Sequence, residues 1–336
     1  MKRLSESSIH YAKPLPEGAT HVVVSQNPKA GSRSAQHRVD RLVERLTAAG
    51  LDVEVHTDLN TVEQRVAESH AVGRLRALVG VGGDGTAAEL VNRTAEGVPL
   101  AMLPSGNENL LARYLGWAKD PDRLAESLLH GRVVRVDAAA ANGRIFLIMA
   151  GCGFDGEVVS RVHARRTGHI RTSHYFKPIA DVVRNYRYPL LQCALTGTER
   201  APADSTPAHS ASEEGRSADE PEQTIAGRWL FVFNFPCYGG SLPIAPYADP
   251  TDGRLDLVAL ERGSMWHALR YATGVYLRRH QHIRDMTTCR VQSVTIAPPE
   301  GEQVAYQLDG DPGGTLPVTI TTLPERLTLI LPAATT

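Results

Sequence analysis

The 336-residue chain has few cysteines, almost no net charge and no long apolar run. Its four cysteines are scattered and form no C-x-x-C pair, so neither a disulfide framework nor a zinc site is indicated. The formal net charge of -1 argues against a general nucleic-acid binder, because such proteins carry a basic surplus that neutralises phosphates. The cysteines are Cys152, Cys193, Cys237 and Cys289.

The absence of long apolar runs also limits where the protein is expected to act. No run reaches the roughly 18 apolar residues that a membrane-spanning helix needs. Residues 1–20 lack the apolar core of a signal peptide and are predicted to be a flexible tail. We therefore expect a cytoplasmic protein in a reducing compartment.

The length predicts two domains, and the pattern of strands and helices changes near residue 133. Over residues 21–132, short β-branched runs alternate with helical patterns, as in HVVVSQ followed by RVDRLVERLTAAG. Strands that alternate with helices indicate βαβ crossovers and a parallel sheet with helices on both faces. The expected fold of this half is a three-layer α/β domain.

Residues 133–336 have mostly the pattern of antiparallel strands. The first two are expected to join at Asn142-Gly143, a dipeptide typical of tight hairpins because both residues tolerate positive φ. Helix is predicted only around residues 155–187 and in the segment that follows Ser264, its expected N-cap. Residues 197–226 are rich in Ser, Pro, Ala and acids, and are predicted to be a disordered insertion.

A glycine-rich turn carries the main indication of chemistry. The segment VGVGGDGTAAEL, residues 79–90, places four glycines and Asp84 where an apolar run gives way to a helical pattern. It contains the string G-x-G-x-x-G of dinucleotide-binding folds, but on the third predicted strand instead of the first. A plain strand-to-helix turn is the structural alternative. Thr86 and Glu89 have the spacing of a capping box, so a structural role at the start of the helix is expected for both.

Asp84 makes this turn more specific. Successive glycines let backbone N–H groups approach an anion, and the positive end of the following helix favours a phosphate. A carboxylate in the same loop would repel that phosphate unless a divalent cation lay between them. The pattern therefore indicates a magnesium-bound nucleotide phosphate.

Two further polar turns follow neighbouring predicted strands, SQNPKAGS after the first and LPSGNENLLAR after the fourth. Each alone is most simply an ordinary turn with an N-cap. Open α/β sheets place ligands at the carboxyl ends of their strands, where these turns would converge with the glycine-rich turn. The residues that they offer are Asn27, Lys29 and Gly31, and Ser105, Gly106, Asn107 and Asn109.

These motifs also resemble a known family. GGDGT at 82–86, with Glu89 and Asn92, followed by PSGNEN at 104–109, resembles the catalytic domain shared by diacylglycerol kinases, sphingosine kinases and bacterial soluble lipid kinases. NPKAGS is similar to the family's first nucleotide loop. GGDGT occurs in NAD kinases too, but three later segments, GCGFDGEVV, APYADPTDGRLDLVAL and YQLDGD, resemble the second domain of the lipid kinases in the same order.

The resemblance implies an α/β ATP-binding domain and an antiparallel β-sandwich lipid-acceptor domain. It implies transfer of the γ-phosphate of Mg-ATP to a lipid hydroxyl, diacylglycerol-like or sphingoid-like, with Asp84 organising Mg2+ and the phosphates. ADPTDGRLD resembles the family's structural magnesium loop, in which Asp252 supplies a carboxylate and Asp249 and Arg254 supply carbonyls; a plain turn is the alternative. The implied ATP pocket is lined by Asn27, Lys29, Gly31, Gly82, Gly83, Gly85, Thr86, Ser105, Gly106, Asn107 and Asn109.

The chain departs from the family pattern at two positions. Asn107 stands where the family commonly has Thr, which changes shape and removes a hydroxyl. The family's proposed general base is the Glu of a D-G-E motif, whereas this chain has Asp309-Gly310-Asp311, so Asp311 is the candidate base with a side chain one methylene shorter. The alternatives left open are an NAD kinase and a nucleotide-regulated lipid-binding protein that has lost catalysis.

Residues 161–187 carry seven basic side chains against one acid, Asp181. Such a segment in a nearly neutral protein is expected either to dock on anionic lipid headgroups or to be a solvated face. Docking would place the protein at the inner face of the membrane as a peripheral protein that meets its lipid acceptor there. No nucleic-acid partner is expected, and a homodimer is left open.

Overall fold

The structure is a computed structural model that describes residues 12–26, 33–164, 182, 184–200, 223–279 and 283–333. The chain divides into two units. The first runs to Ala138 and resumes at Pro324, and the second is Ala139–Leu323. The sequence predicts one domain over residues 133–336, whereas residues 133–138 and those from Pro324 onward fall in the first unit. Strand β18, Val318–Leu331, begins in the second unit and ends in the first.

The first unit is built on a parallel sheet, as predicted. Its strands follow the order β18-β5-β4-β2-β3, and each neighbouring pair is parallel. Val22, Val23 and Val24 of β2 are fully buried, which is typical of a strand covered on both faces. The strands are β2 His21–Gln26, β3 Asp52–His56, β4 Leu75–Gly82 and β5 Pro99–Pro104.

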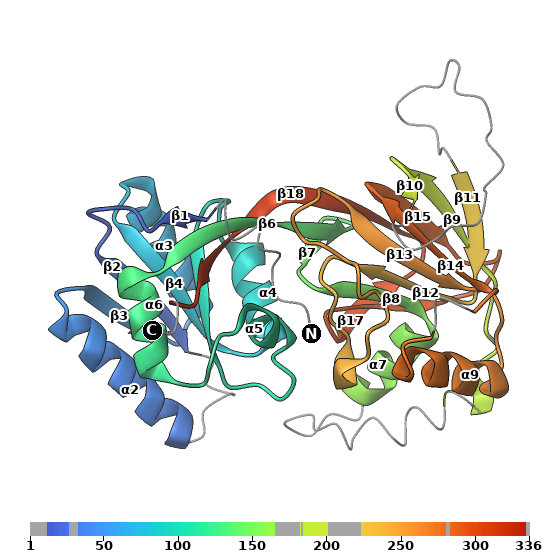
Figure 1. Ribbon diagram of the computed structural model, residues 1–336, viewed down its shortest axis with the longest axis horizontal. Helices are drawn as coiled ribbons and strands as arrows, with labels where there is room; N and C mark the ends of the chain where they lie inside the picture. The colour runs from blue at the N-terminus through green and yellow to red at the C-terminus, as the bar shows by residue number, and fades with distance from the viewer. Residues whose placement is uncertain are drawn as a thin grey trace, which may run out of the picture. The chain divides into compact units, whose positions relative to one another are not determined.

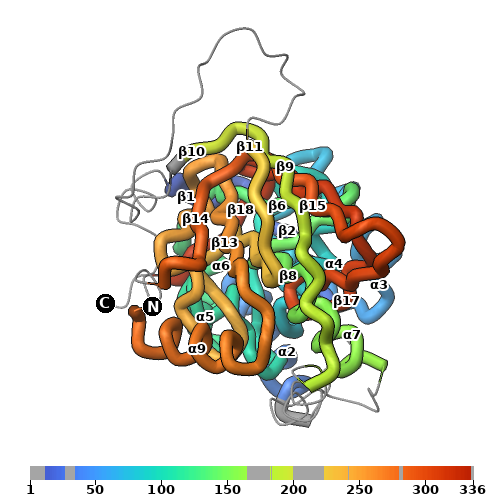
Figure 2. Tube along the Cα trace, turned by 90° about the vertical axis from the view of Figure 1, so that its right-hand side faces the viewer, coloured from blue at the N-terminus to red at the C-terminus, as the bar shows by residue number. Residues whose placement is uncertain are grey.

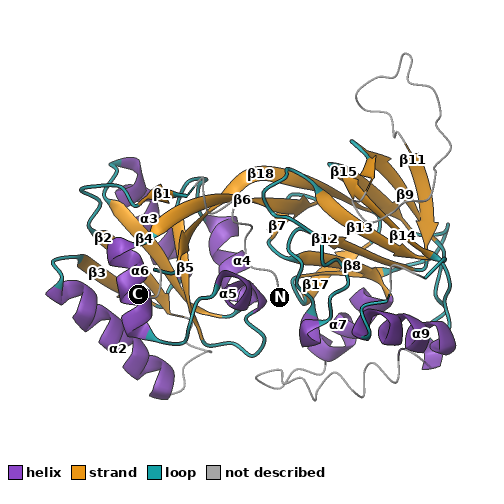
Figure 3. Cartoon of the chain, viewed as in Figure 1, coloured by secondary structure: helices purple, strands orange, loops and turns teal. Residues whose placement is uncertain are grey.

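Helices cover both faces of this sheet, which gives the predicted three layers (Figures 1 and 3). Helices α2 and α6 lie on one face, and α3 and α4 lie on the other. In α2, Val39, Leu42 and Leu46 are buried at helical spacing against the sheet. The helices are α2 Arg33–Ala48, α3 Leu59–Ala71, α4 Asp84–Arg93, α5 Leu110–Leu115 and α6 Pro121–His130.

Residues 12–20 of the predicted tail are described, and they pack on the first unit. Strand β1, Lys13–Pro14, pairs antiparallel with the start of β6, Arg132–Ala141. Ala12, Leu15 and Ala19 are buried.

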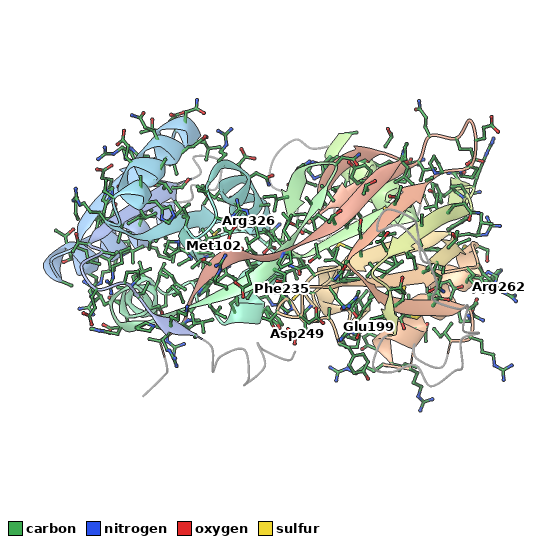
Figure 4. The ribbon with its side chains drawn as sticks, turned by 90° about the horizontal axis from the view of Figure 1, so that it is seen from above. Met102, Glu199, Phe235, Asp249, Arg262 and Arg326 are labelled. Atoms are coloured by element: carbon green, nitrogen blue, oxygen red, sulfur yellow. The ribbon has the colours of Figure 1, made fainter. Side chains whose placement is uncertain are left out.

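The C-terminal strand completes the first unit. Thr328 and Leu329 of β18 pair with β5, and Trp117 Nε1 donates a hydrogen bond to the Ile330 carbonyl at 2.8 Å. The guanidinium of Arg326, labelled in Figure 4, donates to the carbonyls of Val91 and Thr94 at the end of α4. These contacts satisfy helix-end carbonyls that would otherwise have no partner.

The second unit is a β-sandwich, as the resemblance implied. One sheet has the order β10-β14-β13-β12-β8-β16-β17, and all its pairs are antiparallel. The facing sheet is formed by β11, β9, β15, the first half of β18, β6 and β7; Figure 2 shows β11, β9 and β15 side by side. Fully buried side chains from both sheets, among them Leu195, Leu257 and Ile296, form the core between them.

The elements of the second unit follow the predicted β-rich pattern. The strands are β7 Arg144–Phe146, β8 Met149–Gly153, β9 Leu191–Thr196, β10 Glu199–Arg200, β11 Gln223–Gly227, β12 Trp229–Phe233, β13 Leu255–Leu260, β14 Met286–Val291, β15 Ser293–Ala297, β16 Ala305–Leu308 and β17 Asp311–Thr315. The helices are α7 Phe154–Ala164, α9 Met265–Tyr276 and the short 3-10 helix η3 Gly239–Ser241.

Two local predictions in this unit are confirmed. Asn142 and Gly143 join β6 to β7 with φ of 47° and 87°, the left-handed values that a tight hairpin requires. Ser264 caps α9, because its Oγ accepts a hydrogen bond from the His267 amide at 3.3 Å. Residues 201–222 of the predicted insertion, and residues 165–181 and 183 of the predicted helical and basic segment, lie outside the described residues. Within the described part of the chain, no helix is long and apolar enough to cross a membrane.

Replacing Leu329 by Ala tests whether β18 stabilises the first unit. Leu329 is 1% exposed, so the substitution should lower the free energy of unfolding by about 2–5 kcal/mol through lost burial and a residual cavity. Urea-induced unfolding measures this change. Val72→Ala, at a side chain that is 69% exposed, is the matched control and should change the value by no more than about 0.5 kcal/mol. Equal stability of the two variants would contradict a role for β18 in the core.

Candidate functional site

The glycine-rich turn joins β4 to α4 in the first unit. Strand β4 ends at Gly82, Gly83 is the N-cap, and α4 begins at Asp84. The predicted capping box of Thr86 and Glu89 is wrong, because Thr86 lies inside the first helical turn. Glu89 instead forms an ion pair with Arg93, four residues later, at 2.6 Å.

The carboxylate of Asp84 caps a different helix from the one it begins. Its Oδ2 accepts a hydrogen bond from the Leu110 amide at 2.9 Å, and its Oδ1 accepts one from the Leu111 amide at 3.0 Å. These are the first amides of α5, which have no partner within their own helix. Asp84 therefore ties the GGDGT turn to the turn that follows β5.

Burial has the largest effect on the pKa of Asp84 and raises it. The hydrogen bonds from Leu110 and Leu111 act in the opposite direction, because they stabilise the charged carboxylate. The nearby charge of Glu108 adds to the increase. A cation close to Asp84 would oppose both of the effects that raise its pKa.

Glycines allow the two turns to approach each other closely. The Ser105 amide donates to the Gly82 carbonyl at 2.9 Å. A Cβ atom on Gly106 would lie 2.9 Å from the Gly83 Cα atom, and one on Gly82 would lie 2.1 Å from the Thr86 Oγ1 atom. Neither position has room for a side chain. At Gly106 the close neighbour is the Gly83 backbone, so the two turns are in direct backbone contact there.

Asn109 shapes the second turn. Its Oδ1 accepts from the Gly106 amide at 3.0 Å, and its Nδ2 donates to the Gly106 carbonyl at 2.6 Å. Asn109 is buried and has a φ of 47°, a left-handed value that Asn tolerates better than most residues. Its side chain thus holds the turn closed in this structure.

Ser105 offers the clearest ligand-binding group of the two turns. Its Oγ is buried, and within the described residues it has no hydrogen-bond partner. A buried hydroxyl of this kind costs free energy unless a ligand or water satisfies it. A ligand with phosphate or hydroxyl oxygens fits this position.

The structure brings together most of the residues expected in the nucleotide pocket. Gly85 and Asn107 are exposed, and Thr86 and Ser105 are partly exposed. Asn27, Lys29 and Gly31 of the first predicted loop lie outside the described residues. Grouped at the ends of β4 and β5 are Gly82, Gly83, Asp84, Ser105, Gly106 and Asn109.

The candidate base, Asp311, lies in the second unit at a tight hairpin between β16 and β17. Asp309 and Gly310 are the two turn residues, with φ of 52° and 85°. The Asp309 carboxylate accepts hydrogen bonds from the amides of residues 147, 148 and 149 at 2.7, 2.8 and 3.0 Å. Asp309 thus anchors the hairpin to the start of β8, whereas the Asp311 side chain is 40% exposed.

His163 of α7 lies beside Asp311. Its Nε2 is 3.4 Å from the Asp311 Oδ1, and the imidazole side chain is 18% exposed. No sequence motif marks His163, because the packing of α7 on the β16–β17 hairpin brings together residues that are far apart in the chain. Its position allows it to orient the Asp311 carboxylate.

A buried network of polar side chains is hydrogen-bonded to the β16–β17 hairpin. The Asp155 carboxylate accepts from the Tyr238 hydroxyl at 2.5 Å and from the Gln307 Nε2 at 2.8 Å. The Gln307 Oε1 in turn accepts from the Gly310 amide at 2.7 Å. Burial raises the pKa of Asp155, and both side-chain hydrogen bonds oppose the increase. Asp155 and Gln307 lie in GCGFDGEVV and YQLDGD, so the sequence did contain a signal for them.

The predicted magnesium loop, between β12 and β13, is closed by its own hydrogen bonds. The Asp249 Oδ1 accepts from the Thr251 amide at 3.1 Å, and the Asp252 Oδ1 accepts from the Arg254 amide at 3.0 Å. Figure 4 labels Asp249 and Glu199, and the Glu199 carboxylate pairs with the Arg254 guanidinium at 2.9 Å. Within the described residues, no three His, Cys, Asp or Glu side chains gather closely enough to hold a metal ion.

Arginine supplies positive charge near this loop. The Arg290 guanidinium is 3.3 Å from the Asp252 Oδ2 and 3.7 Å from the Asp256 Oδ1. Metal binding through Asp252 and the carbonyls of Asp249 and Arg254 stays a prediction.

Two family models together match nearly all of this chain. The diacylglycerol kinase catalytic domain matches residues 21–141, and the YegS C-terminal NAD kinase beta sandwich-like domain matches residues 148–331. A Mycobacterium tuberculosis protein named diacylglycerol kinase is 28% identical over 320 residues, covering 93% of this chain and 95% of the relative. A Bacillus subtilis protein of the same name is 24% identical over 313 residues, covering 91% and 94%.

The fold of the chain is similar to that of solved structures. The crystal structure of a diacylglycerol kinase from Bacillus anthracis matches with a TM-score of 0.65 and 20% identity, covering 94% of this chain and 98% of that one. At this identity the similarity supports the α/β and β-sandwich fold.

Replacing Asp84 by Asn tests whether its carboxylate stabilises the two turns. The Asn amide group cannot accept a hydrogen bond through its nitrogen, so one of the two α5 amides loses its partner. The free energy of unfolding should fall by about 1–3 kcal/mol in urea denaturation without added nucleotide. Asp52→Asn, which disturbs an exposed ion pair with Arg74, is the control and should cost at most about 1 kcal/mol. Wild-type stability of Asp84→Asn would refute the capping role.

A second prediction concerns pH and Asp256. Burial raises the pKa of Asp256 to about 6, and Arg290 opposes the increase. The folded protein therefore holds this proton more tightly than the unfolded chain, and the cost of the buried charge appears as the pH rises from 3.8 to about 6. Over this window, without divalent cations, the stability of the wild type should fall relative to that of Asp256→Asn by up to about 3 kcal/mol. Urea denaturation at several pH values measures the difference. A constant difference would disprove the raised pKa.

Proposed function

The chain belongs to the bacterial diacylglycerol kinase-like family of lipid kinases, and from this premise we propose that it transfers the γ-phosphate of Mg-ATP to a lipid hydroxyl. The observation that carries the proposal is the pair of glycine turns that Asp84 ties together. Two backbone turns in contact suit a triphosphate, because a carboxylate lies at their junction and a buried hydroxyl beside them has no hydrogen-bond partner among the described residues.

The nucleotide would bind at the ends of β4 and β5. The N-terminus of α4 favours a phosphate group, and the glycines let its oxygens approach the backbone. The Ser105 hydroxyl would donate to a nucleotide oxygen, which would satisfy this buried group. Magnesium, when bound with ATP, neutralises phosphate charge that Asp84 would otherwise repel. Asp84 thus has two roles in this proposal, since it also holds the two turns together.

Asp311 would act as the general base for the acceptor. Its exposed carboxylate can accept the proton of a hydroxyl group as the hydroxyl oxygen attacks the γ-phosphorus and the bond to the ADP leaving group breaks. His163, at 3.4 Å, would restrict the orientation of this shorter carboxylate. Asp309 and Gln307 keep the hairpin in place below it.

Two relatives named diacylglycerol kinase support the choice of a lipid alcohol as the acceptor class. We propose a diacylglycerol-like or sphingoid-like alcohol as the acceptor. Such an acceptor resides in a membrane, so the protein would act at a membrane surface, on the cytoplasmic side where ATP is present. The magnesium loop of Asp249, Asp252 and Arg254 would have a structural role in the second unit.

Incubation with labelled ATP and Mg2+, and separately with diacylglycerol, a sphingoid base or NAD, tests the reaction. We expect labelled lipid. Asp311→Asn should lower kcat by about 100-fold or more, because it removes the base, whereas Asp311→Glu should retain more activity because it keeps a carboxylate. Ser105→Ala should raise the KM for ATP about fivefold, because one hydrogen bond to the nucleotide is lost.

Asp52→Asn is the control and should match the wild type in every assay. Unlabelled lipid together with labelled NAD would assign the protein to the NAD kinases. No label in any acceptor, with nucleotide binding retained, would assign it to the lipid-binding proteins that have lost catalysis. Unchanged activity of Asp311→Asn would exclude Asp311 as the base.

A further inference from the structure

Helix α9 exposes an unusual concentration of large apolar side chains. Nine such side chains are exposed in the described part of the chain, and five of them lie within residues 265–277. Trp266 is 72% exposed, and Tyr276 is 76% exposed. The five are Met265, Trp266, Leu269, Tyr276 and Leu277. Monomeric proteins seldom gather exposed apolar groups in this way unless the surface binds something.

The opposite face of α9 is fixed to the second unit. Tyr271 and Val275 are buried, and the Tyr271 ring packs edge-on against Trp229 with centroids 6.4 Å apart. The Tyr271 hydroxyl donates to the Asp285 Oδ2 at 2.7 Å. Ser264 caps the start of the helix. The helix is therefore held firmly, and its outward apolar face is a stable feature of the surface.

Basic side chains are frequent in the segment that contains this helix. The described residues from 261 to 285 include five exposed arginines and only two acids, Glu261 and Asp285. Asp285 pairs with Arg270 and lies 3.7 Å from the Arg262 Nε, so it offsets only those two. The arginines are Arg262, Arg270, Arg278, Arg279 and Arg284.

We propose that α9 is a membrane-docking helix that binds the surface of an anionic lipid bilayer. Its apolar side chains would enter the boundary between headgroups and acyl chains, where Trp and Tyr are favoured. The arginines would lie at the level of the lipid phosphates, where each basic residue adds to the binding. Charge complementarity therefore identifies the occupant as an anionic membrane.

A second copy of the chain fits this surface less well. In a two-fold symmetric contact the same patch meets itself, so five arginines would face five arginines. Like charges brought together in this way disfavour association. A single face of a 12-residue helix is also small beside the 20–30 residues that each partner contributes to a standard interface.

The docking helix lies at the same end of the second unit as α7. Figures 1 and 2 both show α7 and α9 at the lower end of this unit, with β10 and β11 at the opposite end. Helix α7 carries His163, which lies beside Asp311. Docking through α9 goes beyond the proposed reaction and does not depend on it.

Tryptophan fluorescence with lipid vesicles tests the proposal directly. The chain has three tryptophans, and Trp117 and Trp229 are buried, so Trp266 alone is placed to report membrane entry. With vesicles of phosphatidylcholine and phosphatidylglycerol at low salt, we expect a blue shift of the emission and cosedimentation of the protein. Pure phosphatidylcholine vesicles, or high salt, should weaken both.

The double variant Trp266→Ser with Leu269→Ser should bind the anionic vesicles at least about tenfold more weakly, because it removes apolar surface that would leave water. Arg278→Glu with Arg279→Glu should weaken binding at low salt by a similar factor. Val72→Ser, which removes an exposed apolar side chain in the first unit, is the matched control and should bind like the wild type. Both α9 variants change exposed residues, and circular dichroism checks that they are folded.

Three outcomes would overturn the proposal. The wild type would show no vesicle binding, the α9 variants would bind like the wild type, or sedimentation would show a dimer that Trp266→Ser dissociates. Activity on a short-chain acceptor dissolved as monomers separates docking from catalysis. If that activity is absent but the vesicle results hold, the proposed reaction fails and the docking surface stands.

Discussion

Two hydrogen bonds from the amides of α5 to the Asp84 carboxylate hold the first unit's candidate site together. They fix the turn after β4 against the turn after β5, and the glycines at positions 83 and 106 make this contact possible. The same carboxylate lies at the N-terminus of α5, where a negative charge is favoured. A residue that first suggests metal chemistry is therefore also a structural clamp, and a nucleotide would meet a site whose geometry is already set.

In the second unit, too, a carboxylate that accepts backbone hydrogen bonds fixes a turn, but a second carboxylate is the chemically available one. In Asp309-Gly310-Asp311, two carboxylates are separated by one glycine, yet the first accepts three backbone amides and the second is open to solvent beside His163. The hairpin geometry produces this difference, because the turn residue faces the start of β8 while Asp311 already belongs to β17. A structural carboxylate thereby fixes the position of a chemically available one.

Periodicity and turn chemistry were enough to predict the parallel sheet, the β-rich second half, the Asn142-Gly143 hairpin and the Ser264 cap. These features depend on neighbours in the chain. The carboxylates of Asp84 and Asp309 accept hydrogen bonds from backbone amides 26 and about 160 residues away. Every residue except proline has a backbone amide, so the sequence does not show which amides a carboxylate will bind. The capping box predicted at Thr86 is wrong because α4 begins earlier, at Asp84. Its N-cap is Gly83, which has no side chain, and the Asp84 carboxylate binds the amides of α5 instead. His163 became visible only through the packing of α7 on β17.

Strand β18 has a consequence for how the protein is made. It is the neighbour of β5 in the first unit and of β15 in the second, and it follows all the other described strands in the chain. During synthesis, β5 is therefore an unpaired edge strand of the α/β sheet until residues near 328 have left the ribosome. Open edges of this kind recruit other chains. The nascent protein should consequently be exposed to such association until β18 has paired with β5.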